Sequence, residues 1–172
     1  MHPSAGYNSF PARIMLAGIW GVICAAILAA PILVSHACPR AASVLYFCFS
    51  CICHQIPERS FMILGYPLAV CHRCFGIYIG LFLGSLIENR FVHKSPQARR
   101  FWVMASGVPL MLDVFLPCAG LWSNTNLSRF LTGLLFGSLI SPILACGVAE
   151  FLNETSQRRW AIGDVHLKGG VS

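Results

Sequence analysis

Long apolar runs dominate this 172-residue chain and limit most strongly what it can fold into. A helix needs about 20 apolar residues to cross the hydrocarbon core of a bilayer, and three runs reach that length, at 14–34, 101–122 and 130–152. Only 10% of the residues are charged, whereas soluble domains carry about 25%. The chain therefore lacks the polar surface of a water-soluble protein, and we predict an all-α integral membrane protein with one polytopic domain over residues 1–172.

A fourth span is harder to place because polar residues interrupt its apolar run. The uninterrupted part, 75–87, has only 13 residues, which is too short to cross a bilayer. A helix that begins at Pro67, a residue suited to the first helical turn, would have 21 residues and a length of about 31 Å. We therefore predict four transmembrane helices, the second at 67–87, and a short re-entrant or interfacial Cys-rich segment, 41–53, between the first and the second.

Basic residues lie mostly on one side of this four-span arrangement. The side with both termini carries eight of them, Arg13, Arg90, Lys94, Arg99, Arg100, Arg158, Arg159 and Lys168, and the other side carries Arg40, Arg59 and Arg129. The positive-inside rule then makes both termini cytoplasmic, with 153–172 as a cytoplasmic tail, in a multi-pass protein of the inner membrane. The net charge of +6 reflects this topology and contact with anionic lipid, so we expect the bilayer as a partner and no nucleic acid.

Small residues recur at every fourth position in two of the predicted spans. They are Gly76, Gly80 and Gly84 in the second span and Gly133 and Gly137 in the fourth. This spacing gives a flat strip on one helix face, along which two backbones can approach closely. We expect the two spans to touch there, within one chain or across a homodimer or larger membrane complex.

Thiols and imidazoles gather between residues 48 and 74. Cys71 and Cys74 form a C-x-x-C pair at the start of the predicted second span, where positions three apart share a helix face. With Cys53 or His54 from the preceding segment, three or four nitrogen and sulfur ligands can converge, as tetrahedral zinc requires. We predict an outer-facing transition-metal site, for zinc or copper, at Cys53, His54, Cys71 and Cys74.

The same residues support other interpretations. Oxidising compartments convert paired thiols to disulfides, so a structural bridge such as Cys48 to Cys71 competes with a metal site. A helix N-terminus and the neighbouring Arg73 also lower a thiol pKa, which suits a Cys71/Cys74 redox pair. The sequence does not decide whether the protein is an enzyme.

An ionisable residue, Asp113, lies inside the predicted third span. A charge inside a membrane helix costs about 2.5 to 3.5 kcal/mol on insertion scales, so this carboxylate should face the protein interior and pair with Arg73 or Arg129. Together with Arg59, which follows the Cys-rich segment, these residues form the predicted charged support of the site.

A resemblance to a known family emerges from these motifs. The matching residues are Cys53-His54-Gln55, Glu58-Arg59-Ser60-Phe61, Gly65-Tyr66-Pro67-Leu68, Cys71, Arg73-Cys74, Gly76-Ile77-Tyr78, Gly80, Pro109, Asp113, Ser123-Asn124, Arg129 and Thr132-Gly133. Over 53–137 the chain resembles the prokaryotic membrane-protein family catalogued as domain of unknown function 2085. The resemblance implies a small polytopic membrane protein without an assigned activity, and it carries over no catalytic residue.

Three functions remain open at this point. The first is metal binding or transport, with the ion either structural or cargo. The second is a membrane thiol-disulfide oxidoreductase, because the layout is similar to that of quinone-linked disulfide generators and vitamin K epoxide reductases, although Cys118 alone stands where they carry a second Cys pair. The third is a non-catalytic accessory subunit of a membrane complex.

Overall fold

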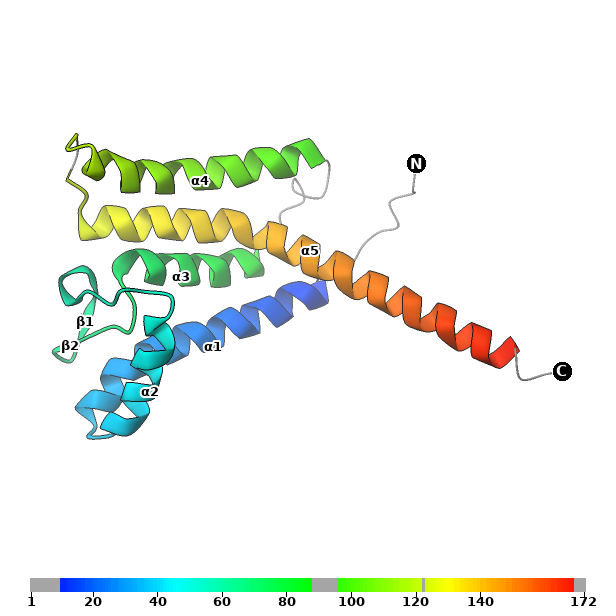
Figure 1. Cartoon of the computed structure of the whole chain (residues 1–172), viewed down its shortest axis with the longest axis horizontal. Helices are drawn as coiled ribbons and strands as arrows, with labels where there is room; N and C mark the ends of the chain where they lie inside the picture. Colours follow the sequence, from blue (N-terminus) through cyan, green and yellow to red (C-terminus); the bar gives the residue numbers. More distant parts are fainter. Residues whose placement is uncertain (1–9, 88–95, 122, 169–172) are drawn as a thin grey trace.

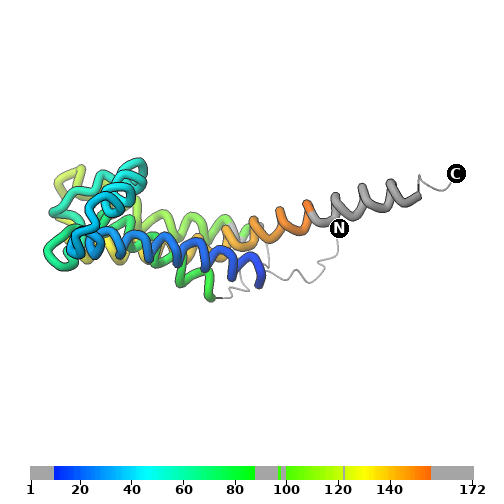
Figure 2. The backbone as a smooth tube through the Cα atoms, turned by 90° about the horizontal axis from the view of Figure 1, so that it is seen from below, coloured from blue at the N-terminus to red at the C-terminus, as the bar shows by residue number. Residues whose placement is uncertain are grey.

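The computed structural model describes residues 10–87, 96–121 and 123–168, which are mostly helical (Figure 1). Its elements in chain order are α1 (Phe10–Ser35), α2 (Pro39–Ser50), the 3-10 turn η1 (Pro57–Arg59), β1 (Met62–Ile63), β2 (Tyr66–Pro67), α3 (His72–Leu86), α4 (Pro96–Cys118) and α5 (Asn126–Lys168). In the bundle, α3 lies between α1 and α5, and α4 packs on the other side of α5 (Figure 1). The short α2 folds back against α1 at the end that holds the Cys-rich segment (Figure 2).

Among the described residues, three helices are long and apolar enough to cross a membrane. They are Phe10–Ser35, Arg100–Cys118 and Asn126–Thr155, which correspond to the predicted first, third and fourth spans. The third is shorter than its predicted range, 101–122, because α4 ends at Cys118. The helix of the predicted fourth span, α5, is longer than predicted. It continues to Lys168, so that most of the expected tail is helical. Residues 169–172 of that tail, like Arg90 and Lys94, lie outside the described residues.

The predicted second span, 67–87, is wrong at its beginning. α3 starts only at His72 and has 15 residues, a length of about 22 Å. Pro67 lies instead in β2, paired antiparallel with β1, because the fixed φ of proline suits an edge strand as well as a first helical turn. Leu64 and Gly65, with φ of 52° and 82°, form the two-residue turn between the strands, the conformation that tight hairpins require.

Despite its shortness, α3 returns the chain to the end where α1 begins. Arg13, near the start of α1, donates hydrogen bonds to the last carbonyls of α3, at 3.2 Å to Ser85 and 2.6 Å to Leu86. Such a contact satisfies carbonyls that have no partner within their own helix. Residues 68–70, which lead into α3, are non-helical and almost completely buried, as irregular backbone at membrane depth must be.

The predicted contact between the small-residue strips is confirmed within one chain, as α3 against α5. A Cβ on Gly76 would collide with the carbonyl oxygen of Phe130, and one on Gly84 would lie 2.6 Å from the carbonyl oxygen of Ser138. The Ser141 hydroxyl also donates to the carbonyl of Leu81 at 2.8 Å, which links the two helices. The small-residue face of α3 is thus covered by that of α5 within one chain.

Candidate functional site

Three cysteine sulfurs converge at the end of the bundle where α3 begins. The Sγ atoms of Cys53, Cys71 and Cys74 lie within 4.8 Å of one another, and all nine cysteines of the chain are free thiols. Cys53 follows α2 and is buried, Cys71 is the N-cap of α3, and Cys74 stands in its first turn. Zinc–sulfur bonds of about 2.3 Å in a tetrahedral site place sulfurs roughly 3.8 Å apart, so three ligands are already close to the required geometry.

Backbone and amide contacts hold the two cysteine-bearing segments together. The N–H of Cys71 donates to the Sγ of Cys53 at 3.2 Å. The side-chain amide of Gln55 donates to the carbonyls of Tyr46 at 2.7 Å and Ala69 at 2.8 Å, and the Tyr46 hydroxyl donates to the carbonyl of Pro67. Sequence reasoning missed the role of Gln55 and Tyr46; the position of Gln55 directly after Cys53-His54 was the available signal.

The thiols influence one another's ionisation. Hydrogen bonds from the side chain of Cys53, and then from that of Cys74, hold the pKa of the Cys71 thiol well below its ordinary value of 9.0, against the opposing effect of burial. Backbone hydrogen bonds at Cys74 and Arg73 act in the same direction. One thiolate of the three is therefore favoured, and thiolate is the form that binds metals and reacts as a nucleophile.

A cavity of about 370 Å³ opens beside the three sulfurs. It is lined by Ile52, Cys53, His54, Gln55, Ile56, Arg59, Cys71, Arg73 and Cys74. His54, a predicted ligand, lines this cavity but is exposed and does not belong to the group close enough to share an ion. His72, between the two cysteines, is buried against Phe61, with ring centroids 4.1 Å apart.

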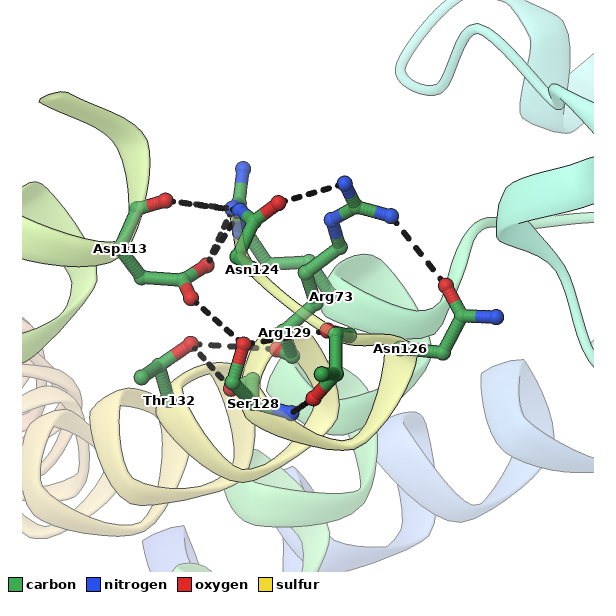
Figure 3. Close-up of polar contacts among 8 residues, drawn as sticks. Arg73, Asp113, Asn124, Asn126, Ser128, Arg129 and Thr132 are labelled. Atoms are coloured by element: carbon green, nitrogen blue, oxygen red, sulfur yellow. Dashed lines mark hydrogen bonds and ion pairs between the residues drawn. The ribbon is translucent and has the colours of Figure 1, made fainter. Parts of the chain in front are cut away.

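A polar network lies next to this cavity and is centred on Asp113. Of its two predicted partners, Arg73 makes the ion pair. The carboxylate also accepts a hydrogen bond from the Ser128 hydroxyl at 2.9 Å, and the Asn124 amide donates to the Asp113 carbonyl at 2.9 Å (Figure 3). Arg129 reaches the carboxylate only indirectly, because it donates to the Asn124 side-chain oxygen at 2.6 Å. The network joins α3, α4 and the start of α5.

A second cavity, of about 270 Å³, adjoins the first. It is lined by Arg59, Arg73, Asp113, Val114, Pro117, Cys118, Asn124 and Arg129. Arg59 and Arg73 line both cavities, so the thiols and the Asp113 network share a wall. The structure thus places the predicted charged residues around one region. Asn124 and Ser128, which sequence reasoning did not connect to Asp113, complete it.

The chain is similar to two archaeal proteins. It is 38% identical over 96 residues to an uncharacterised protein of Methanocaldococcus jannaschii. The matched residues make up 54% of this chain and 61% of that relative. It is 36% identical over 89 residues to an uncharacterised protein of Methanothermobacter thermautotrophicus. The matched residues make up 52% of this chain and 80% of that relative. No solved structure matches the chain.

A family model also matches, over residues 53–143. The matched region contains all eight predicted site residues: Cys53, His54, Arg59, Cys71, Arg73, Cys74, Asp113 and Arg129. It covers more than half of the chain and includes the whole predicted core, 53–137. The chain therefore belongs to the family of predicted membrane proteins defined by domain of unknown function 2085.

Proposed function

We propose that this protein is a multi-pass membrane protein whose three-thiol centre binds a soft transition-metal ion, zinc or copper. The observation that carries the proposal is the convergence of the Cys53, Cys71 and Cys74 sulfurs, within 4.8 Å of one another, from two separate segments. Thiolate ligands select zinc and Cu(I) over the harder cations. The hydrogen bond from the Cys71 N–H to the Cys53 sulfur supports this role, because such contacts orient a ligand and stabilise its charge.

The three sulfurs line the 370 Å³ cavity, which leaves room for a fourth ligand. His54 lines the same cavity and would supply that ligand if its ring turned toward the sulfurs, whereas a position left open would suit a transferred or catalytic ion. Three thiolates leave an excess of negative charge on a divalent ion, and the guanidinium groups of Arg59 and Arg73 on the same cavity offset it. A structural ion that fastens residues 51–55 to the start of α3 is the simpler of the two roles.

The membrane arrangement follows from the same layout. With the buried segment 68–70 before it, α3 serves as the second of four spans in a single polytopic domain, and the thiol cavity faces the outside of the inner membrane. Figure 1 supports this arrangement, because α1 begins and α3 ends near one end of the bundle while the Cys-rich segment lies at the other. Both termini are then cytoplasmic.

A thiol-disulfide oxidoreductase is the second candidate, and the lowered pKa of Cys71 favours it. In that reaction the thiolate of Cys71 and the thiol of Cys74 form a disulfide, and two electrons and the released protons pass to a quinone. The two sulfurs are within 4.8 Å of each other, so a modest movement brings them to bonding distance.

Metal analysis of the purified protein in detergent separates these functions. The metal-binding proposal predicts one zinc or copper ion per chain, retained in the matched control Cys48→Ser and lost in Cys71→Ser and Cys74→Ser. Cys48 is exposed and stands in the same region outside the cluster, so its substitution controls for thiol loss. Metal-free protein with a Cys71–Cys74 disulfide that re-forms with a quinone would replace the proposal with the second candidate. If neither property is found, the remaining candidate is a non-catalytic accessory subunit.

A further inference from the structure

The second cavity contains more positive charge than its only acid can balance. Three guanidinium groups, from Arg59, Arg73 and Arg129, and a single carboxylate, from Asp113, line its wall. Asp113 is already paired with Arg73 and accepts a hydrogen bond from Ser128. Among the described residues, Arg59 and Arg129 have no ion pair with a carboxylate, so the cavity has an excess of cationic groups.

Donor groups in this cavity also lack acceptors. The Nε of Arg73 is buried and has no hydrogen-bond partner among the described residues, and the side chain of Arg59, which lines the cavity from η1, makes no hydrogen bond or ion pair there. Leaving a buried donor without a partner is unfavourable, and such groups are normally satisfied by water, an ion or a ligand. An acceptor placed between these arginines would satisfy them.

Neutral groups, not acids, hold Arg129 in position. Its guanidinium donates to the side-chain oxygens of Asn124 at 2.6 Å and Asn126 at 3.2 Å (Figure 3). Amide oxygens fix the orientation of a guanidinium but leave its full charge available to a ligand. The arrangement therefore positions the charge without neutralising it.

Two helices add to the positive potential. Arg73 stands in the first turn of α3, and Arg129 in the first turn of α5. The N-terminus of a helix carries roughly half a positive charge and presents free N–H groups. The two helices begin at the same end of the bundle (Figure 1). Their N-terminal dipoles therefore add to the positive potential of the arginines.

We infer that Arg59, Arg73 and Arg129 form a binding site for a phosphate group in the second cavity, which shares Arg59 and Arg73 with the thiol cavity. Guanidinium forks match the several oxygens of a phosphate in bidentate pairs, and three such groups, from η1, α3 and α5, line this cavity. The cavity volume of about 270 Å³ accommodates a phosphate with a short attached group. The site lies at one end of the membrane-crossing bundle, where both water and lipid headgroups are within reach. The phosphate therefore belongs either to a soluble molecule or to the headgroup of an acidic phospholipid.

Binding of two probes to the full chain in uncharged detergent tests this inference. The probes are inorganic phosphate and dihexanoyl phosphatidic acid, with dihexanoyl phosphatidylcholine as the neutral-headgroup comparison, and affinity is measured by calorimetry at constant ionic strength. We expect Arg59→Gln to weaken binding about tenfold, the effect of losing one charged hydrogen bond, and Arg59→Gln with Arg129→Gln to abolish it. The control Arg40→Gln removes the same charge from an exposed position in α2 and should bind normally.

The outcomes identify the source of the phosphate or overturn the site. Tight binding of inorganic phosphate indicates a soluble ligand, and binding of phosphatidic acid alone indicates a lipid headgroup. Thermal unfolding of each variant shows whether it remains folded; Arg59 is exposed, so its substitution should leave stability unchanged. The inference is overturned if the wild-type protein binds neither probe, or if Arg59→Gln and Arg40→Gln bind them equally. The measurement is made on metal-free and on metal-loaded protein, so failure of this inference is distinguishable from failure of the metal-binding proposal.

Discussion

The contact between α3 and α5 and the Cys-rich end of the bundle are built on opposite principles. Along the helix contact, glycines leave no side chain between the two helices at Gly76, Gly80, Gly133 and Gly137, so that backbone meets backbone there. At the Cys-rich end, irregular backbone is held by a few specific contacts, such as the bond from the Cys71 N–H to the Cys53 sulfur. The first region provides a rigid frame, and the second positions chemistry on it. Arg73 and Cys74 belong to both, because they stand in the first turn of α3.

The largest expected effect is on the glycine contact. A Cβ on Gly80 would lie 2.8 Å from the backbone N of Ser138 and 3.0 Å from the Cα of Gly137, and neither backbone can move aside alone. We expect Gly80→Ala to lower the free energy of unfolding by about 3 kcal/mol, the upper range for overpacking. Reversible unfolding in mixed detergent measures it.

Gly107→Ala in α4 is the matched control, because nothing lies within 4 Å of a Cβ at that position. There the substitution should be neutral or stabilise the helix by up to about 1 kcal/mol. Equal losses from both substitutions would contradict the packing difference.

The second effect concerns the reactivity of Cys71 at acidic pH. Because its pKa is lowered, the thiolate persists as the pH falls below the ordinary thiol pKa, and its contribution to folding is lost only at still lower pH. Between pH 8 and pH 6, alkylation of Cys71 in metal-free protein should change little, whereas that of free glutathione should fall by roughly a hundredfold. Mass spectrometry of labelled peptides gives the rate, and parallel falls in both thiols would show that Cys71 is unperturbed.

The third effect concerns the Asp113 network. In Asp113→Asn, Arg73 keeps its charge but loses its counter-ion, so the free energy of unfolding should fall by about 2 kcal/mol, less than for a fully buried pair because Arg73 is partly exposed. In a double-mutant cycle with Arg73→Gln, the second substitution should cost much less in the Asp113→Asn background than alone. Strictly additive losses would mean that the two side chains do not interact.

The smallest effect is expected at Gln55. Its two hydrogen bonds connect α2 to the segment before α3, and their loss in Gln55→Ala should cost about 1 kcal/mol. The clearer result is local, because the buried Cys53 thiol should be alkylated faster. Gln97→Ala, at an exposed position of α4, is the control, and an unchanged rate for Cys53 in Gln55→Ala would remove the proposed role of the amide.

The two regions also differ in how well the sequence predicts them. The apolar runs and the glycines at every fourth position follow helical geometry alone, so three spans and the contact of α3 with α5 are predicted correctly. Arg73 is one of two partners predicted for Asp113, and the structure selects it. Apolar runs and glycine spacings depend on the helical repeat alone, and this repeat can be read directly from the sequence.

The Cys-rich end depends on choices that a local pattern does not decide. Pro67 suits a helix start and an extended strand equally, and the turn at Leu64 and Gly65 commits it to the strand. Asn124 and Gln55 act through hydrogen bonds to carbonyls distant in the sequence, which no spacing rule predicts. The extent of α5 is also missed, because the residues after 152 are mostly polar and carry no apolar run that would extend the predicted span.

X-ray absorption at the metal edge counts the sulfur ligands of a bound ion and so tests the three-thiol centre. On purified protein loaded with one equivalent of zinc or copper, we expect a first shell with three sulfur atoms, at about 2.3 Å for zinc, reduced to two sulfurs in Cys53→Ser. A first shell of nitrogen and oxygen alone, or a sulfur count that Cys53→Ser leaves unchanged, would show that the three thiols do not form a metal centre.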